Sequence, residues 1–347
     1  MDAPRVSIII LNWNGWKDTI ECLESLYRID YPNYDVIVVD NGSHDDSIQK
    51  IKEYAKGKIE VNSKFFKYNP NNKPIKVFEV NENEAKRGKF NRPLYEKFDV
   101  DRRMILIKNK KNYGFTGGNN IGMKFALSVL NPDYVLLLNN DTVVEKDFLK
   151  KLVKVAESDE KIGIVGPKIY YYDYNGKSNV IDFAGAYLIL WRCGEKRHCF
   201  RKVDKGQCDK ILEVDKVEGS CMLIKSEITT NVGLFDEKFF AYWEETDLCV
   251  RAKKEGYKLV YVPKAKIWHK IASSSGGVLS VFYVYHMTRN RFWFLIKNFP
   301  QLLKMHLLYV VLWELWLKFG VFVVYHKKPK MFFVYLKGLL DGLSLKS

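Results

Sequence analysis

The chain lacks the marks of several protein classes. Its six cysteines include no Cys-x-x-Cys pair, and it has no periodic glycine repeat or low-complexity tract, which excludes collagen-like and low-complexity proteins. Its N-terminus has an acidic residue and a proline before the first apolar run, without a basic region or a cleavage site, so we expect no signal peptide. Acidic residues are relatively few: the chain has 41 Asp and Glu residues and 56 Lys and Arg residues, which gives a net charge of +15. This surplus predicts an anionic partner, such as a nucleotide, a lipid surface or a nucleic acid.

The composition supports a large core and an appendage. The 347 residues are 47% hydrophobic and 14% aromatic, and their number favours two parts. We expect a catalytic domain over residues 1–275 and a helical tail over residues 276–347. From Val281 onward, ten Lys or Arg residues face only Glu314 and Asp341, and three tryptophans accompany them. Such basic, aromatic helices are typical of an anionic membrane interface, so we predict that the tail is membrane-associating.

One apolar segment in this tail covers residues 307–325, where Glu314 and Lys318 are the only charges. A spanning helix needs about twenty apolar residues. The two charges lie four residues apart and could pair on one helix face, but charges near the centre of the hydrocarbon layer are costly. We therefore predict a helix lying in the interface, with a spanning helix or one packed on the protein as the alternatives.

The cysteines fall into two groups. Cys22, Cys221 and Cys249 lie in apolar segments, where a thiol packs as a small hydrophobe, and this usage favours a reducing compartment. The remaining three lie near His198 and could form a small metal site or a disulfide; they are Cys193, Cys199 and Cys208.

Apolar runs alternate with helical patterns over the first 160 residues, which is typical of a parallel sheet covered by helices. Strands are predicted at residues 6–11, 34–39, 104–108, 134–138, 162–167 and 258–262. Helices are predicted at residues 16–28, from 43 or 45 to 54, and at 118–130, 147–157 and 244–255. Residues 62–103 have three prolines and little periodicity, so we expect an insertion, either a flap or a small substructure at the domain's edge.

Polar residues follow three of the predicted strands, where an open α/β sheet binds its ligands. Trp13 offers a stacking face for a base, Asp40 could accept from a base or ribose, and Asp141 could hold a divalent cation beside a diphosphate. Asp and Asn also commonly end strands as turn residues, which is the alternative for each one alone.

Three further features could carry chemistry. Residues 112–120 form a glycine-rich stretch ahead of a helix, either a phosphate-binding loop or a tight turn. Glu244, Glu245 and Asp247 begin a helix after an aromatic run, either as a solvated acidic cap or as a partly dry pocket with a general base. His269 ends a strand and could be a metal ligand or a surface imidazole.

Taken in order, these motifs resemble the family-2 inverting glycosyltransferases of GT-A fold, especially their rhamnosyltransferase-like branch. The resemblance covers residues 6–291: LNWNG, VDNGSxDxS, NxGFxGGNNxG, LLxNxD, a GxxMLI turn, FAYxEExDLCxRAxxxG and a strand ending in WH. It implies a GT-A fold with one Rossmann-like nucleotide-binding sheet. It also implies transfer from a nucleotide-diphosphate sugar to a hydroxyl of a glycan or lipid-linked glycan. From the basic, aromatic tail we predict that this transfer takes place on the cytoplasmic side of a cell membrane.

The resemblance also assigns roles to residues. Glu245 stands at the general base position, with Glu244 and Asp247 as further catalytic candidates. Asp141 and His269 are the expected ligands of Mg²⁺ or Mn²⁺. The expected donor-binding residues are Leu11, Asn12, Trp13, Asp40, Asn41, Asn112, Gly114, Asn119, Asn139 and Asn140.

Three other functions compete with this interpretation. A polyprenyl-phosphate sugar synthase has the same fold with a phosphate as nucleophile, and it is the second candidate. A degenerate, binding-only relative would lack turnover. A nucleic-acid-binding protein would explain the charge, but the sequence has no helix-turn-helix, zinc-finger or ribonucleoprotein motif, so we expect no nucleic-acid partner.

Overall fold

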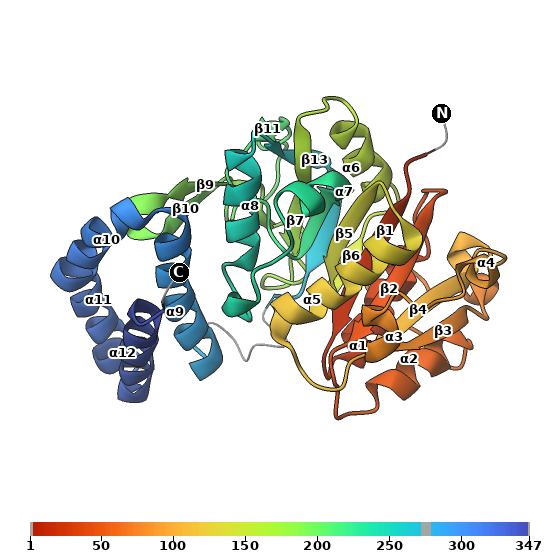
Figure 1. Ribbon diagram of the computed structural model, residues 1–347, viewed down its shortest axis with the longest axis horizontal. Coiled ribbons are helices and arrows are strands. Elements are labelled where there is room, and N and C mark those ends of the chain that lie inside the picture. The colour runs from red at the N-terminus through yellow and green to blue at the C-terminus, as the bar shows by residue number, and fades with distance from the viewer. Residues whose placement is uncertain (1–2, 272–278, 346–347) are drawn as a thin grey trace.

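The computed structural model describes residues 3–271 and 279–345, which form a sheet domain and a group of C-terminal helices (Figure 1). The main sheet has the strand order β11-β13-β7-β12-β5-β1-β2-β4-β3, with β6 paired to β13 and β8 to β7. Its strands are β1 (Val6–Asn12), β2 (Tyr34–Asp40), β3 (Lys76–Asn81), β4 (Arg103–Lys108), β5 (Tyr134–Asn139), β6 (Thr142–Val144), β7 (Ile162–Tyr171), β8 (Ile181–Phe183), β11 (Leu212–Glu213), β12 (Cys221–Lys225) and β13 (Lys258–His269). A separate hairpin pairs β9 (Ala186–Ile189) with β10 (Gly194–Arg197).

Helices cover both faces of this sheet because its central strands are apolar on both sides. In β1, Ile8 and Ile10 enter one core and Ile9 enters the other, as the period of two in a strand requires. One face packs against α1 (Trp16–Leu26), α2 (Ser47–Ala55) and α6 (Phe148–Ala156). The other packs against α3 (Glu82–Lys86), α5 (Gly114–Phe125), α7 (Ser226–Asn231) and α8 (Glu244–Lys254). Cys22, Cys221 and Cys249 are fully buried, as the sequence predicts.

The strands predicted in the first 160 residues, β1, β2, β4 and β5, pair in parallel as expected, whereas the complete sheet is mixed. The GxxMLI motif continues into β12, which runs antiparallel between β5 and β7. Residues 62–103 contain the edge strand β3, which pairs in parallel with β4, as well as α3 and the short α4 (Arg92–Tyr95). The last predicted strand is longer than expected and reaches His269. The sequence pattern does not predict these segments fully, because each pairs with a strand far away along the chain or has a weak apolar periodicity.

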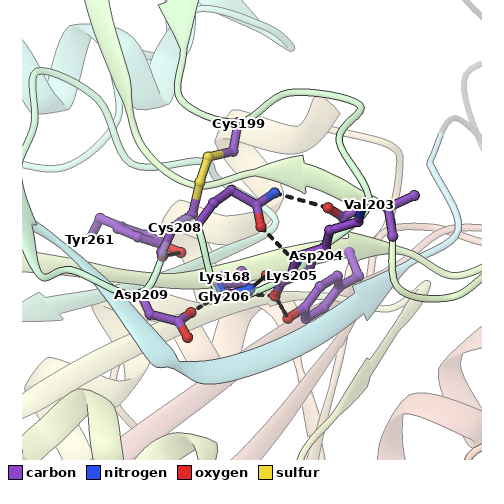
Figure 2. Close-up of a disulfide and its surroundings, with 11 residues drawn as sticks. Lys168, Cys199, Val203, Asp204, Lys205, Gly206, Cys208, Asp209 and Tyr261 are labelled. Atoms are coloured by element: carbon purple, nitrogen blue, oxygen red, sulfur yellow. Dashed lines mark hydrogen bonds and ion pairs between the residues drawn. A yellow bond between two sulfur atoms is a disulfide. The ribbon is translucent and has the colours of Figure 1, made fainter.

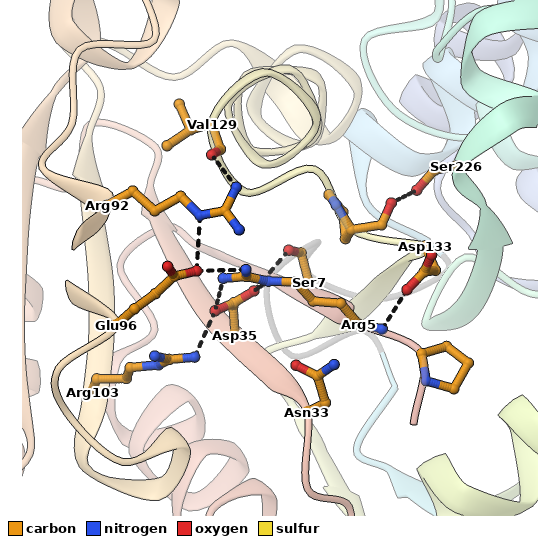
Figure 3. Close-up of polar contacts among 12 residues, drawn as sticks. Arg5, Ser7, Asn33, Asp35, Arg92, Glu96, Arg103, Val129, Asp133 and Ser226 are labelled. Atoms are coloured by element: carbon orange, nitrogen blue, oxygen red, sulfur yellow. Dashed lines mark hydrogen bonds and ion pairs between the residues drawn. The ribbon is translucent and has the colours of Figure 1, made fainter. Parts of the chain in front are cut away.

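A buried charge network fixes the edge opposite the strands' polar ends (Figure 3). The Asp35 carboxylate is fully buried and accepts from Arg5 Nε at 2.8 Å and from Arg103 at 3.2 Å. Arg5 also reaches Glu96 at 2.6 Å, which ties α4 to the beginning of β1. Because a buried carboxylate is stable only when it is paired, this cluster has a structural role.

A disulfide settles the alternatives for the cysteine group near His198. Cys199 and Cys208 are bonded to each other (Figure 2). Cys193 forms no disulfide. Fully buried Lys168 pairs with Asp204 at 2.8 Å and with Asp209 inside the same loop. Tyr261 donates to the Cys208 carbonyl at 2.9 Å. The disulfide and these contacts hold residues 199–209 against β7 and β13.

The tail helices form a group beside α8, at the end of the molecule away from β3 (Figure 1). They are α9 (Val281–Asn298), α10 (Leu303–Tyr309), α11 (Leu315–Phe319) and α12 (Pro329–Leu343). Trp293 and Phe294 of α9 are buried against Phe239 and Val250, so α9 packs on the catalytic domain. A Cβ at Gly342 of α12 would lie 2.7 Å from the Arg289 carbonyl, which shows how closely α12 approaches α9.

The apolar segment of the tail belongs to one helix that spans residues 300–325. Its most apolar 18-residue window has a mean hydropathy of 1.9, and 17% of that window is buried. By length and composition the helix could cross a membrane. The spacing of four residues suggested an ion pair between Glu314 and Lys318, but Glu314 has a different partner. Its carboxylate instead binds Arg291 of α9 at 2.6 and 2.7 Å, because Arg291 is buried and needs a counter-ion.

Candidate active site

The predicted ligand-binding residues gather where the strand order reverses. β1 lies between β5 and β2, and the chain leaves these strands in opposite directions along the sheet. The parallel register sets Leu11 opposite Asn139 and Asn12 opposite Asp40. Ligands bind at this kind of switch point in open α/β sheets.

Several predicted donor-binding residues are buried and hold the strand ends together. Asn12 donates to Asp40 at 2.8 Å and accepts from Thr19 at the same distance. Asp40 also accepts from the Ser43 hydroxyl at 2.6 Å. Asn140 donates to Thr19 at 3.0 Å. Trp13, in contrast, is 40% exposed and presents its ring at the same edge.

The glycine-rich stretch is not a loop, which corrects the prediction that its helix begins at residue 118. α5 begins at Gly114, and a Cβ at Gly118 would lie 2.5 Å from Leu11 Cδ1, so this glycine permits close packing of helix and strand. Asn41 donates to Asn112 at 2.9 Å and to the Gly114 carbonyl at 3.0 Å. Asn119 donates within the helix, to the Phe115 carbonyl at 2.9 Å.

The structure brings the two predicted metal ligands together. β6 pairs antiparallel with the end of β13, so that His269 lies opposite Thr142 and next to Asp141. His269 Nε2 is 3.1 Å from Asp141 Oδ1, and both side chains are largely buried. Burial lowers the pKa of His269, but the neighbouring Asp141 carboxylate more than offsets this and raises it above its ordinary value. His269 is therefore not a surface imidazole.

The acidic start of α8 is buried, so it is not a solvated cap. Glu244 is 4% exposed and Glu245 is 8% exposed, whereas Asp247 is fully buried. Burial and then the charge of Glu245 raise the pKa of Glu244 well above its ordinary value. The Asp247 carboxylate accepts from Arg251 at 2.8 Å, and from Lys297 and Asn298 of α9 at 2.9 and 2.8 Å. Because these three partners bind Asp247, we infer a structural role for it, whereas Glu245 lies beside Gly219.

One turn connects the Asp141 and Glu245 sites. The Ser220 carbonyl accepts from Asn139 N at 2.9 Å, at the end of β5. A Cβ at the adjacent Gly219 would lie 3.5 Å from Glu245 Cβ. Glu218, on the other side of this glycine, interacts electrostatically with both His269 and Glu244. The Asp141–His269 pair and the candidate base therefore flank a single short segment.

The segment before α8 adopts an uncommon backbone conformation. Phe240, Tyr242 and Trp243 all have positive φ values, at 62°, 69° and 78°. Such strain persists only when the surroundings fix it, and it occurs often at functional sites. Here Asn290 of α9 fixes it by donating to three carbonyls, those of Phe239 at 2.7 Å, Ala241 at 2.7 Å and Tyr242 at 2.9 Å. Gly114, at φ +72°, packs against Phe240 and so brings α5 to this segment.

The sequence did not single out Asn290, Lys216 or Glu218. Lys216 is 6% exposed and forms an ion pair with Glu245 Oε1 at 3.0 Å. Asn290 lies in a helix rich in aromatic residues, and Lys216 and Glu218 lie between the recognised motifs. None of the three therefore belongs to a recognisable sequence pattern.

Comparison with known proteins identifies the family. The family model described as "Glycosyltransferase like family 2" matches residues 74–298, and the model described as "Glycosyl transferase family 2" matches residues 7–95. The chain belongs to glycosyltransferase family 2. This confirms the resemblance and the enzyme class predicted from the motifs.

Relatives of known name place this family-2 chain near hexosyl- and rhamnosyltransferases. It is 27% identical over 191 residues to the low-salt glycan biosynthesis hexosyltransferase Agl10 of Haloferax volcanii, covering 54% of this chain and 58% of that protein. It is 26% identical over 190 residues to rhamnosyltransferase WbbL of Escherichia coli, covering 50% of this chain and 67% of that one. The match to Agl10 thus spans little more than half of that relative's length. A 60-residue segment is 43% identical to an N-acetylglucosaminyl-diphospho-decaprenol L-rhamnosyltransferase of Mycobacterium tuberculosis, covering 17% of this chain and 20% of that protein.

Solved structures confirm the GT-A fold of this family-2 chain. The mannosyltransferase PcManGT of Pyrobaculum calidifontis, in complex with GDP-Man and Mn²⁺, aligns with a TM-score of 0.54 at 14% identity, covering 99% of this chain and 88% of that one. TarS 1-349 of S. aureus aligns with a TM-score of 0.52 at 13% identity, covering 98% of this chain and 81% of that one.

Proposed function

We propose that this family-2 chain is an inverting glycosyltransferase that moves a sugar from a nucleotide-diphosphate donor to a hydroxyl of a lipid-linked glycan. The observation that carries the proposal is the convergence of the Asp141–His269 pair and Glu245 on the turn around Gly219. The pair faces the switch point, where a diphosphate would lie, and the carboxylate flanks the same turn. The names of the rhamnosyltransferase relatives support the sugar-transfer chemistry.

Glu245 is the proposed general base. Its carboxylate takes the proton from the acceptor hydroxyl as that oxygen attacks the anomeric carbon, on the side opposite the diphosphate. The new carbon–oxygen bond forms while the bond to the diphosphate oxygen breaks, and the nucleoside diphosphate leaves. Glu244, the neighbouring carboxyl, is more deeply buried, and burial and the charge of Glu245 raise its pKa well above its ordinary value.

Asp141 and His269 are the proposed ligands of Mg²⁺ or Mn²⁺. The donor set fits a divalent cation, since a carboxylate oxygen and an imidazole nitrogen lie 3.1 Å apart. His269 Nδ1 is buried and has no hydrogen-bond partner among the described residues. A bound cation would neutralise charge on the diphosphate as it leaves. The structural neighbour PcManGT was solved in complex with Mn²⁺, which supports a divalent metal in this fold.

The donor base is proposed to stack on exposed Trp13, near Leu11 and Asp40. Asn12 and Asn41 shape this edge through the contacts described above, and their amides hold the chain in position. Asn139 is half-buried at the end of β5 and is proposed to face the donor. We also propose that Gly114, Asn112, Asn119 and Asn140 form the border of the donor site.

The tail is proposed to bind an anionic membrane surface on the cytoplasmic side and to hold the active site near its lipid-linked acceptor. Trp313 is 65% exposed and Trp316 is 73% exposed on the apolar helix. Glu314 on the same helix is paired with Arg291 of α9, which favours a helix lying in the interface over a spanning one. Exposed lysines can contact anionic headgroups, each contributing on the order of 1 kcal/mol; they are Lys304, Lys327, Lys328, Lys330 and Lys337.

Liposome flotation tests the membrane proposal on the full chain. Wild type is expected to float with vesicles containing anionic lipid, and the double variant Trp313→Asp/Trp316→Asp is expected to stay largely at the bottom. The matched control is Leu94→Asp/Ile211→Asp, which removes two exposed apolar side chains of the catalytic domain at 44% and 58% exposure. Equal flotation of all three proteins would contradict membrane binding through this helix.

A donor panel tests the proposed function itself. We expect one of the UDP-, GDP- or dTDP-sugars to stabilise the protein against heat in the presence of Mn²⁺, and to be converted to the nucleoside diphosphate when a polyprenyl-diphosphate glycan is added. Transfer to a polyprenyl monophosphate instead would favour the synthase alternative. Stabilisation without turnover on any acceptor would favour a binding-only protein.

A further inference from the structure

Lys216 lies in a cage of three carboxylates at the proposed base. Its ammonium group is 3.0 Å from Glu245 Oε1, 3.0 Å from Glu195 Oε2 and 3.7 Å from Glu218 Oε2. Burial alone would lower the pKa of Lys216, but the three carboxylates more than offset this and raise it well above its ordinary value. The side chain is therefore a fixed positive charge at the base.

The backbone on both sides of Lys216 is also fixed. Its N–H donates to the Ala186 carbonyl at 3.1 Å, and its carbonyl accepts from Ala186 N at 3.4 Å, at the start of β9. The same hairpin supplies Glu195 and Arg197 from β10. The Arg197 guanidinium lies 3.7 Å from Glu218 Oε2, so the cage carboxylates are themselves held by the hairpin.

The tip of this hairpin packs against the tail. Leu188 and Leu190 contact the cluster that contains Trp293. The Trp191 carbonyl is 3.2 Å from His306 Nδ1 of α10. The hairpin that carries Glu195 is thus held at its tip by the tail and at its start by the backbone of Lys216.

The ion pair distinguishes the two neighbouring glutamates at the start of α8. Glu245 has a cation at its Oε1, which leaves Oε2 to receive a proton. Glu244 Oε2 is buried and has no hydrogen-bond partner among the described residues. The two neighbouring carboxylates therefore differ in their partners, because in the described part of the chain only Glu245 has an ammonium group within ion-pair distance.

We propose that Lys216 is a positioning residue for the transfer reaction, one that orients the Glu245 carboxylate by binding Oε1 while Oε2 faces the acceptor. Glu195 is the residue that sets the strength of this effect, because it shares the same ammonium group. The proposal rests on the proposed function, in which Glu245 is the base. Other titratable groups surround the pair from every adjacent segment: Glu218, Arg197, Glu244, Cys249 of α8 and Tyr283 of α9.

The test is the pH profile of kcat/KM for the acceptor, whose acidic limb reports the free enzyme's base. In Lys216→Met the limb is expected to move to higher pH, by roughly one to three units, because a carboxylate without its cation takes up a proton more readily. In Lys216→Arg it is expected to stay close to wild type. In Glu195→Gln it is expected to move to lower pH, since the ammonium group then acts on Glu245 with less competition. Donor affinity is expected to be unchanged in all three.

Lys253→Met is the matched control, because Lys253 also lies on α8 but pairs with Asp215 at 2.5 Å and not with Glu245. Its profile is expected to superimpose on that of wild type. If Lys216→Met does not fold, the opposite shift in Glu195→Gln still decides the matter. If the acidic limb of the pH profile stays at its wild-type position in an active Glu195→Gln enzyme, or in a folded Lys216→Met enzyme, the proposed role of Lys216 is wrong. The proposed function of the protein would not be affected by that result. A wild-type protein that transfers no sugar would overturn the proposed function, and this inference with it.

Discussion

Glu245→Gln is expected to lower kcat by about 10²- to 10⁴-fold while donor affinity stays within twofold of wild type. The substitution keeps the shape of the side chain and the packing against Gly219, but the amide cannot take the acceptor's proton. A single-turnover transfer assay and a calorimetric donor titration measure the two quantities. Glu255→Gln, an exposed position just after the same helix, is the control and is expected to behave as wild type.

The same experiment discriminates among the acidic residues of α8. Asp247 is held by Arg251, Lys297 and Asn298, so its replacement by Asn is expected to lower stability more than it lowers the chemical step. If Glu245→Gln transfers sugar within a few-fold of wild type, the base is Glu244 or Asp247. Glu244 would then have to ionise in spite of its burial.

Asp141→Asn is expected to remove the metal dependence of donor binding. The two proposed protein ligands, Asp141 and His269, would fill only part of a divalent ion's usual six positions, so the diphosphate oxygens would supply others. We therefore expect Mn²⁺ alone to bind weakly, and Mn²⁺ with nucleoside diphosphate to bind tightly. Loss of one ligand is expected to weaken the metal-dependent affinity by at least about 100-fold.

Calorimetric titration of UDP, GDP and dTDP, each with and without Mn²⁺, measures this effect. Asp46→Asn is the control, because Asp46 is an exposed carboxylate at the start of α2, on the same edge of the sheet. An Asp141→Asn protein that keeps the full gain in affinity from Mn²⁺ would place the cation site elsewhere.

The sequence predicted the fold well where periodicity is strong and local. The central strands and most of the helices were predicted within a few residues, because their apolar residues recur at a period of two or 3.6. The strand β12 was interpreted as a turn because its five residues lie between better-marked motifs. The edge strand β3 has mostly exposed or half-buried residues and lacks the strong apolar signal of the central strands.

The sequence also predicted only part of the candidate site. Asp141 and His269 were grouped through the family resemblance, and the physical reason for their contact is the β6–β13 register, which joins segments more than 120 residues apart. Asn12 and Asn41 were assigned to the donor, yet their amides are taken by contacts within the protein. Lys216 could not be found from sequence, since its importance depends on a hairpin that folds back onto it.

The anomeric configuration of the transferred sugar tests the central claim most directly. In the proposed single displacement, Glu245 deprotonates an acceptor hydroxyl that attacks opposite the diphosphate, so each transfer must invert the anomeric carbon. Proton NMR of the product made from an α-linked nucleotide sugar is expected to show the β-linked glycoside. A product that retains the α configuration would contradict the account, because it would require a different displacement geometry and a different role for Glu245.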